Sequence, residues 1–201
     1  MARVTAEIKE ATRARLLAAA AREFALAGFE RASVDEISVA AGYAKGTIYN
    51  YFPSKEDLFL AVVQEALAQA GATGPVPPGA TAWDRLTAML TGFCGWAGRH
   101  DPLARVLVRE CLMGTPGLYP RVIGAEWPLT AELEAIIRDG IRDGELRADL
   151  PADLLALAVA GLTDLALVQH WASGGTRPTL AETPALVLTL LLGPRRAGSG
   201  A

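Results

Sequence analysis

The stretch AKGTIYNYFPSKEDLF, residues 44–59, decides how the N-terminal part of this chain is interpreted. It combines four aromatic rings with a glycine and a lysine, and its first nine residues include no acidic side chain. On a helical wheel of about 100° per residue, Ile48 and Phe52 fall on one face. Thr47 and Asn50 fall on the opposite face. The pattern predicts a short helix that is anchored by Ile48 and Phe52 and presents polar groups outward.

Helix-start and helix-stop signals surround this stretch. Residues 33–36 read Ser-Val-Asp-Glu, the spacing of a capping box, in which side chains accept hydrogen bonds from unpaired N–H groups at a helix start. A first helix is expected over residues 5–27 and ends at Gly28. A capped fourth helix is expected over residues 54–70. The predicted order is therefore a long helix, a short helix, a glycine turn, a second short helix and a longer helix.

The outer side of residues 44–51 is rich in hydrogen-bond donors. No acidic residue occurs between Ile37 and Lys55, and Lys45 and Lys55 bracket the stretch. Such donors bind phosphate oxygens and base edges, and a short helix after a tight turn fits a major groove about 12 Å wide. Glycine in a helix interior costs about 0.5–1 kcal/mol relative to alanine. We therefore expect a partner to approach the bare backbone at Gly46.

The composition is that of a soluble helical protein. The chain has 201 residues, of which 51% are hydrophobic, and a net charge of −3; strand signals are nearly absent. Its two cysteines, Cys94 and Cys111, are too few for a disulfide framework, so a cytoplasmic setting is expected. The N-terminal apolar run stops at Arg22, too early for a signal peptide. Residues 154–168 contain Asp164 and fall short of a membrane span, so no membrane is expected as a partner.

The composition changes after the fourth helix. Residues 71–80, GATGPVPPGA, predict a linker because glycine and proline dominate them. Helical patterns resume at about 81–99, 101–114, 117–144 and 151–173. The start of a final helix that ends near Gly193 is ambiguous, because Thr179 caps one version and Thr183 followed by Pro184 caps a shorter one. The fold class is therefore all-α, with about nine helices.

Residues 16–62 resemble the helix-turn-helix domain of the TetR family of transcriptional regulators. The shared positions are dense and collinear: Phe24, Gly28, Ser33, Val34, Ile37, Ala41, Gly42, Lys45, Gly46, Thr47, Tyr49, Tyr51, Phe52, Ser54, Lys55 and Leu58. The resemblance implies that residues 33–41 form a supporting helix and residues 44–51 the recognition helix. The remainder of the chain resembles the family only in length and helical pattern.

The resemblance also implies which residues contact double-stranded DNA. They are Ser33, Tyr43, Ala44, Lys45, Gly46, Thr47, Tyr49, Asn50, Tyr51 and Lys55. Lys45 and Thr47 would reach base edges or nearby phosphates, the three tyrosines would donate hydroxyls to phosphates, and Lys55 would anchor the DNA backbone. Ala44 departs from the family, which usually has serine there. A simpler interpretation places Tyr49 and Tyr51 at the edges of the core face with their hydroxyls in water.

The resemblance divides the chain into domains. They are a helix-turn-helix domain (1–53) with a connecting helix (54–70), the linker (71–80), a ligand-binding and dimerisation domain (81–193) and a flexible tail (194–201). The expected lining of a small-molecule effector site is Phe93, Trp96, Cys111, Met113 and Trp127, with Arg109, Gln169 and His170 as polar anchors. Such a wall suits a largely hydrophobic effector.

The last two predicted helices are apolar almost all round. Residues 151–193 therefore predict the surface through which two copies form a homodimer. A dimer presents two recognition helices to a near-palindromic operator. The usual output of the family is repression, with operator and effector affinities coupled through the dimer.

Two other functions stay open. Cys94, His100 and Asp101 have the residue types of nucleophilic catalysis, but they form no known motif. No metal-ligand spacing or phosphate-binding loop occurs either, so no catalytic residue, metal or cofactor is predicted. The second alternative is a helical ligand-binding or scaffolding module without DNA binding. Ala44 favours it slightly, whereas Lys45, Thr47, Tyr49 and Lys55 argue against it.

We predict different effects for the two lysines that bracket the recognition helix. Lys55→Ala should weaken operator and nonspecific DNA alike, whereas Lys45→Ala should weaken the operator more. Each lost phosphate contact should also reduce the slope of log affinity against log salt by nearly one unit. Fluorescence anisotropy on both DNAs across a salt series measures this, and equal losses on both DNAs for both variants would contradict the prediction.

Overall fold

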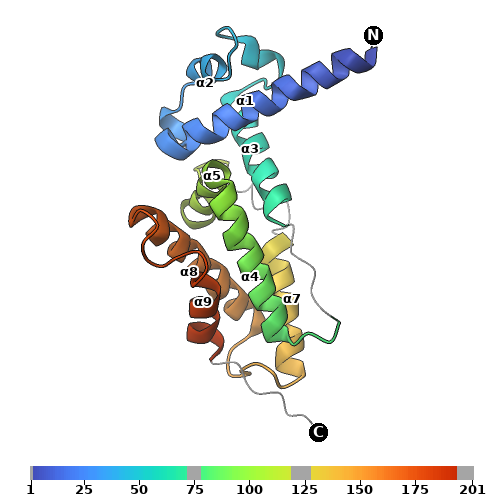
Figure 1. The fold of residues 1–201 in the computed structure, drawn as a ribbon, viewed down its shortest axis with the longest axis vertical. Helices are drawn as coiled ribbons and strands as arrows, with labels where there is room; N and C mark the ends of the chain where they lie inside the picture. The colour runs from blue at the N-terminus through green and yellow to red at the C-terminus, as the bar shows by residue number, and fades with distance from the viewer. Residues whose placement is uncertain (1, 72–77, 119–127, 194–201) are drawn as a thin grey trace. The chain divides into compact units, whose positions relative to one another are not determined.

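The computed structural model describes residues 2–71, 78–118 and 128–193, and all regular structure within these ranges is helical (Figure 1). The elements are α1 (Ala2–Arg31), α2 (Val34–Ala40), the 3₁₀ helix η1 (Thr47–Asn50), α3 (Lys55–Ala70), α4 (Ala82–Arg99), α5 (Asp101–Met113), α7 (Pro128–Arg142), α8 (Ala152–Ala172) and α9 (Thr183–Leu192). The all-α prediction is confirmed. Most of the predicted linker, the start of the helix expected at 117–144, and the tail lie outside the described residues.

The chain divides into two compact units. Unit 1 contains residues 1–67 and 100–122, and unit 2 contains residues 68–99 and 123–201. Helix α5 therefore belongs with the N-terminal helices, where it packs along α1, although the sequence grouped it with residues 81–193. A helix from beyond the predicted linker thus helps to position the elements before it.

An aromatic cluster joins α1 to α3 in unit 1. The ring centroids of Phe24 and Phe29 lie 5.0 and 5.1 Å from that of Phe59, respectively. Gly28 leaves the helical conformation with φ +76°, so α1 breaks there and resumes for one short turn to Arg31. This break, which the sequence predicted at Gly28, allows residues on both sides of it to contact one ring. Such aromatic pairs add about 0.5–1.5 kcal/mol each beyond the burial of their area.

The start of α2 follows the sequence prediction. The Ser33 hydroxyl oxygen accepts a hydrogen bond from the Glu36 N–H at 3.3 Å. Ile37 and Ser38 are buried, and the Ser38 hydroxyl donates to the Ala44 carbonyl at 2.7 Å. This last bond fixes the turn that follows α2.

The predicted α-helix over residues 44–51 is wrong in type and length. Turns follow α2, and a single 3₁₀ turn, η1, begins at Thr47. Gly46 adopts φ +83°, which starts η1 from a left-handed residue rather than from a longer helix. The interior-helix explanation of Gly46 is also wrong, because its left-handed conformation by itself requires glycine. The burial of Ile48 and Phe52 is confirmed, since both side chains are less than 5% exposed.

Unit 2 packs α4, α7, α8 and α9 alongside one another (Figure 1). The apolar face of α4 contributes Leu86, Leu90 and Cys94 to the core. Arg85 on α4 pairs with Asp139 on α7 at 3.2 Å. Gly140 allows α7 to approach the start of α4 closely. The helices are therefore held together by apolar packing, with polar links at the edge.

The start of α9 combines features of both predicted versions. The helix begins at Thr183, with Pro184 in its first turn. Thr179 and Glu182 still form a reciprocal pair just before it: the Thr179 N–H donates to the Glu182 carboxylate at 3.1 Å, and the Glu182 N–H donates to the Thr179 hydroxyl at 3.2 Å. The capping motif therefore organises a turn that precedes the helix.

Helix α8 is long and apolar enough to cross a membrane by length and composition, so the expectation that this region falls short is wrong. The difference arises because the mean hydropathy of 18 residues of this helix stays high, at 1.6, although Asp164 is among them. Only 39% of this 18-residue stretch is buried. Much of the apolar surface of α8 is therefore left uncovered by the described part of the chain.

We predict that Gly140→Ala destabilises unit 2. A Cβ at this position would lie 2.6 Å from the Ala82 Cβ and 2.7 Å from a Leu146 methyl group. Overpacking of this kind costs about 1–3 kcal/mol, so thermal denaturation should show a lower Tm.

Gly95→Ala on α4 is the matched control. Its new Cβ would meet the flexible Arg99 guanidinium at 3.3 Å, and alanine favours helix by up to about 1 kcal/mol. A Tm for Gly140→Ala at or above that of Gly95→Ala would contradict the packing described here.

Candidate nucleic-acid interface

The surface of η1 and the turn before it presents polar side chains to solvent. Ala44, Lys45, Tyr49 and Asn50 are exposed, with Tyr49 at 49%. The other predicted DNA contacts in this segment, Tyr43, Gly46, Thr47 and Tyr51, are half-buried. Ile48 and Phe52 lie beneath, and the Arg13 guanidinium covers the Phe52 ring at 5.5 Å from its centroid. The segment therefore turns one polar side outward from an apolar anchor.

Tyr43 contacts α1 through both its hydroxyl and its ring. Its hydroxyl donates to the Thr12 hydroxyl at 3.2 Å, and Thr12 in turn donates to the Ile8 carbonyl at 2.9 Å. The Arg15 guanidinium lies 5.7 Å from the centroid of the Tyr43 ring. A phosphate contact through the Tyr43 hydroxyl hydrogen would replace the bond to Thr12, so this predicted role competes with an internal one.

Lys55 also has an internal partner. Its ammonium donates to the Glu30 carbonyl at 2.9 Å and lies 4.9 Å from the centroid of the Phe29 ring. A cation is favourable at this position because the carbonyl end of a helix carries partial negative charge. Lys55 therefore joins the start of α3 to the end of α1, and its predicted contact with the DNA backbone stays a prediction.

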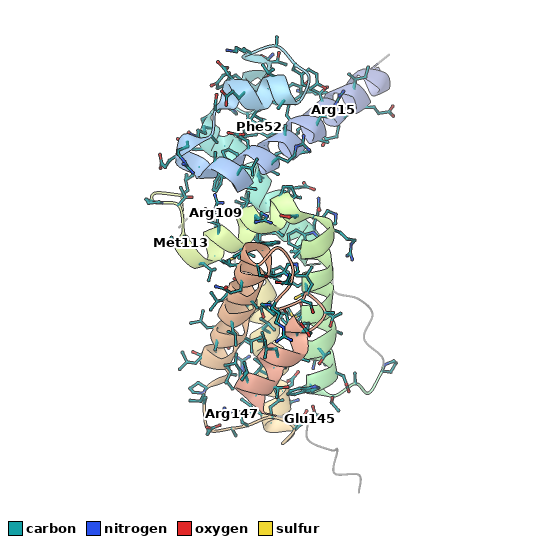
Figure 2. All side chains as sticks on the ribbon, turned by 60° about the vertical axis from the view of Figure 1, so that its left-hand side comes forward. Arg15, Phe52, Arg109, Met113, Glu145 and Arg147 are labelled. Atoms are coloured by element: carbon teal, nitrogen blue, oxygen red, sulfur yellow. The ribbon has the colours of Figure 1, made fainter. Side chains whose placement is uncertain are left out.

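Arg109 on α5 binds the same end of α1 (Figure 2). Its two terminal nitrogens donate to the carbonyls of Phe24 and Ala25 at 3.0 and 2.7 Å. These carbonyls lie in the last turn before the break at Gly28, where regular helical partners run out. A side chain at Gly28 would begin 3.1 Å from the guanidinium. Arg109, predicted as a ligand anchor, thus holds α5 against α1.

The predicted effector residues are divided between the two units. Phe93 and Trp96 stack on α4 in unit 2 with centroids 5.8 Å apart, whereas Arg109, Cys111 and Met113 lie on α5 in unit 1. In unit 2, Gln169 is exposed, and a ring nitrogen of His170 lies 2.8 Å from the Pro178 carbonyl oxygen. Trp127 lies outside the described residues.

A cavity of about 40 Å³ lies between α4, α7 and α8. It is lined by Met89, Leu90, Phe93, Leu133, Ala160, Thr163 and Asp164. Sequence reasoning named only Phe93 of this set. The sequence feature that could have pointed to this cavity is the polar pair Thr163 and Asp164, which interrupts an otherwise apolar helix.

The chemistry of Cys94 argues against a nucleophilic role. Burial, together with the negative charge of Asp164, raises the pKa of the Cys94 thiol to about 12. The thiol therefore stays protonated and weakly nucleophilic at neutral pH. Among the described residues, no group of three or more histidine, cysteine, aspartate or glutamate side chains is arranged to hold a metal ion.

Comparison with known proteins identifies the family. Residues 16–62 match the family model for bacterial regulatory proteins, tetR family, and residues 79–177 match that for the tetracyclin repressor-like C-terminal domain. The HTH-type transcriptional repressor SCO4008 of Streptomyces coelicolor is 32% identical over 160 residues, which cover 75% of this chain and 76% of that protein. The chain belongs to the TetR family.

Two further TetR-family comparisons extend over most of the chain. The HTH-type transcriptional repressor AcnR of Corynebacterium diphtheriae is 30% identical, covering 87% of this chain and 88% of that protein. The structure of FadR from Bacillus subtilis in complex with stearoyl-CoA shares the fold, with a TM-score of 0.74, 22% identity and coverage of 90% of this chain and 98% of that one. This TetR-family chain is a transcriptional regulator with DNA-binding and ligand-binding domains, and not an enzyme.

We predict that Arg109→Ala destabilises unit 1 by about 1–3 kcal/mol, because two partly buried carbonyls before the helix break lose a charged donor. Affinity for promoter DNA should fall as well, since α1 supports η1 through Tyr43 and Phe52. Thermal denaturation and fluorescence anisotropy measure the two effects.

Arg105→Ala is the control on the same helix, because Arg105 pairs with Asp101 on the surface of α5. Exposed pairs of this kind contribute roughly 0–1 kcal/mol. Indistinguishable Tm and DNA affinity for the two variants would show that the contact of Arg109 with α1 has no structural effect.

Proposed function

We propose that this TetR-family regulator is a cytoplasmic repressor that binds a near-palindromic operator as a homodimer and is released by a small, largely hydrophobic effector. One observation carries the DNA-binding part. The exposed side of η1 and of the turn before it offers an ammonium, a hydroxyl and an amide from Lys45, Tyr49 and Asn50, while Ile48 and Phe52 lie buried beneath. The relatives named as HTH-type transcriptional repressors support repression as the output.

The dimer proposal rests on an apolar stripe across α8 and α9. Its exposed members are Leu154, Leu157, Leu165 and Val168 on α8 and Leu186 and Leu190 on α9, with Leu157 at 63% and Leu190 at 62%. Gly161 lies within the α8 stripe and has no atom within 4 Å of its Cβ position. A stripe of this extent calls for a covering surface. A second copy supplies the same stripe and can approach closely at Gly161.

A membrane is the other surface that could cover α8. Asp164 argues against insertion of α8 in a membrane, because it lies buried on the side of the helix that packs against α4 and α7. The apolar stripe also continues onto the separate, shorter helix α9. A second copy therefore accounts for both helices, as the family assignment also favours. Two recognition segments spaced by about one DNA turn then explain a near-palindromic operator.

The effector proposal rests on the cavity in unit 2. Five of its seven lining residues are apolar, as expected for a hydrophobic ligand. FadR, which shares the fold, was solved with stearoyl-CoA, a ligand with a long apolar chain. Helix α5 follows α4 after the single residue His100. A ligand that moves Met89 or Phe93 on α4 can therefore bias α5, and reciprocal coupling to operator affinity follows.

Leu157→Glu tests the dimer and the DNA-binding mode together. A charge at this exposed position should separate the subunits because the dimer would bury it unpaired. Light scattering should show a monomer, and affinity for the promoter duplex should fall at least about tenfold, since only one half-site contact remains.

Leu150→Glu is the control, because Leu150 is 44% exposed but precedes α8 and its stripe. It should leave a dimer that binds the promoter normally. A wild-type protein that is monomeric in solution would contradict the dimer, and a dimer that ignores its own promoter at low salt would contradict the regulatory function.

A further inference from the structure

One arginine on α1 lies beside the turn that precedes η1. Arg15 is midway along α1, and its side chain is exposed (Figure 2). Its guanidinium lies 5.7 Å from the centroid of the Tyr43 ring and 3.8 Å from the place where a side chain at Gly42 would begin. Arg15 is therefore next to the two residues that lead into the segment predicted to recognise DNA.

The donors of this guanidinium are available to a ligand. The nearby Arg13 pairs with Glu10 at 3.8 Å and covers the Phe52 ring. Arg15, in contrast, forms neither an ion pair nor a hydrogen bond within the described part of the chain. Its contact with the Tyr43 ring involves no hydrogen-bond acceptor, so its five N–H groups stay available. A guanidinium can bind a phosphate through two parallel N–H groups.

The Tyr43 hydroxyl is less suited to a phosphate contact. Its hydrogen is donated to the Thr12 hydroxyl at 3.2 Å, and the Thr12 hydroxyl donates onward to the Ile8 carbonyl. Phosphate oxygens accept hydrogen bonds, so the Tyr43 hydroxyl could donate to one only by giving up its bond to Thr12. Arg15 would bring a full positive charge to the same place without breaking a bond among the residues that the structure describes.

We propose that Arg15 contacts a DNA phosphate beside the recognition segment and that Tyr43 is a positioning residue, whose ring holds the guanidinium in place. This inference rests on the proposed function, because it takes the exposed side of η1 and of the turn before it as the DNA-binding surface. An arginine side chain has several rotatable bonds, so a ring that restricts it before binding lowers the entropy lost in the complex. A phosphate contact reads no base and adds affinity for any duplex.

Arg15→Ala should weaken binding to the promoter duplex and to a scrambled duplex of the same length by the same factor, roughly tenfold at low salt. The slope of log affinity against log salt should become shallower by nearly one unit for each bound subunit. Arg15→Lys should keep the wild-type slope, because the charge remains, but reach only an intermediate affinity, because an ammonium lacks the planar fork. Fluorescence anisotropy of full-length protein across a salt series measures both quantities.

Arg22→Ala is the matched control. It removes the same charge from an exposed position on the same helix, about 10 Å farther along its axis. It should leave the slope unchanged. Thermal denaturation checks that each variant folds. Should Arg15→Ala not fold, Arg15→Gln removes the charge while keeping much of the side-chain stem, and it should show the same shallower slope.

The role of Tyr43 is tested by removing its hydroxyl and its ring separately. Tyr43→Phe keeps the ring and should bind DNA with nearly wild-type affinity. Tyr43→Leu removes the ring and should weaken binding, but it should have little further effect when combined with Arg15→Ala, since both residues act through one contact. Tyr43→Phe as weak as Tyr43→Leu, with or without Arg15, would instead assign the phosphate contact to the hydroxyl and contradict the positioning role.

Three outcomes would overturn the Arg15 contact while leaving the DNA-binding function intact. They are a wild-type slope for Arg15→Ala, a loss of affinity confined to the promoter duplex, and an equal reduction of the slope by Arg22→Ala. In each of them the wild-type protein still binds its promoter, and Lys45→Ala still weakens that binding. A wild-type protein that binds neither duplex at low salt would contradict the proposed function itself, and this inference with it.

Discussion

The carbonyl end of α1 is the constraint on which unit 1 depends. Gly28 breaks the helix, and the backbone carbonyls on either side of the break need donors that the helix does not supply. The Arg109 guanidinium on α5 donates to the carbonyls of Phe24 and Ala25, and the Lys55 ammonium on α3 donates to the carbonyl of Glu30. Two cations from distant parts of the sequence therefore meet one helix end, where its dipole favours positive charge. The rings of Phe24 and Phe29 pack against Phe59 and join α1 to α3 at the same end of α1.

The position of α5 in the chain connects the proposed effector site with the N-terminal helices. Helix α5 lies within the residues that match the C-terminal domain of the family, yet it packs with the DNA-binding helices in unit 1. It follows α4, which lines the cavity, after one residue. In the proposed function, a change in the cavity would reach α1 through covalent continuity and the bonds of Arg109. The segment predicted to recognise DNA is supported by α1, through the bond of Tyr43 to Thr12 and the contact of Arg13 with Phe52.

Sequence patterns were most informative where a residue's role is local. The break at Gly28, the Ser33 cap and the burial of Ile48 and Phe52 follow from backbone freedom, capping spacing and helical periodicity, which act within a few residues. The type of the recognition segment was harder to predict. Gly46 fits either a helix interior or a left-handed start, and the adjoining turn is fixed by the bond from Ser38 to the Ala44 carbonyl. A helical wheel contains no information about that bond.

The sequence by itself determined the helical fold, the family, and the polar side of residues 44–51, because composition, periodicity and motif spacing are properties of neighbouring residues. Tertiary structure alone decided which distant side chains meet. Arg109 could have faced a ligand, but its guanidinium binds α1, since the helix break offers two unpaired acceptors. Asp164 could have been read as an interruption of an apolar helix, but packing places it beside Thr163 on a cavity wall. The contact between residues 24 and 109, and the cavity that residues 93 and 164 both line, depend on how helices pack, and no local pattern encodes that geometry.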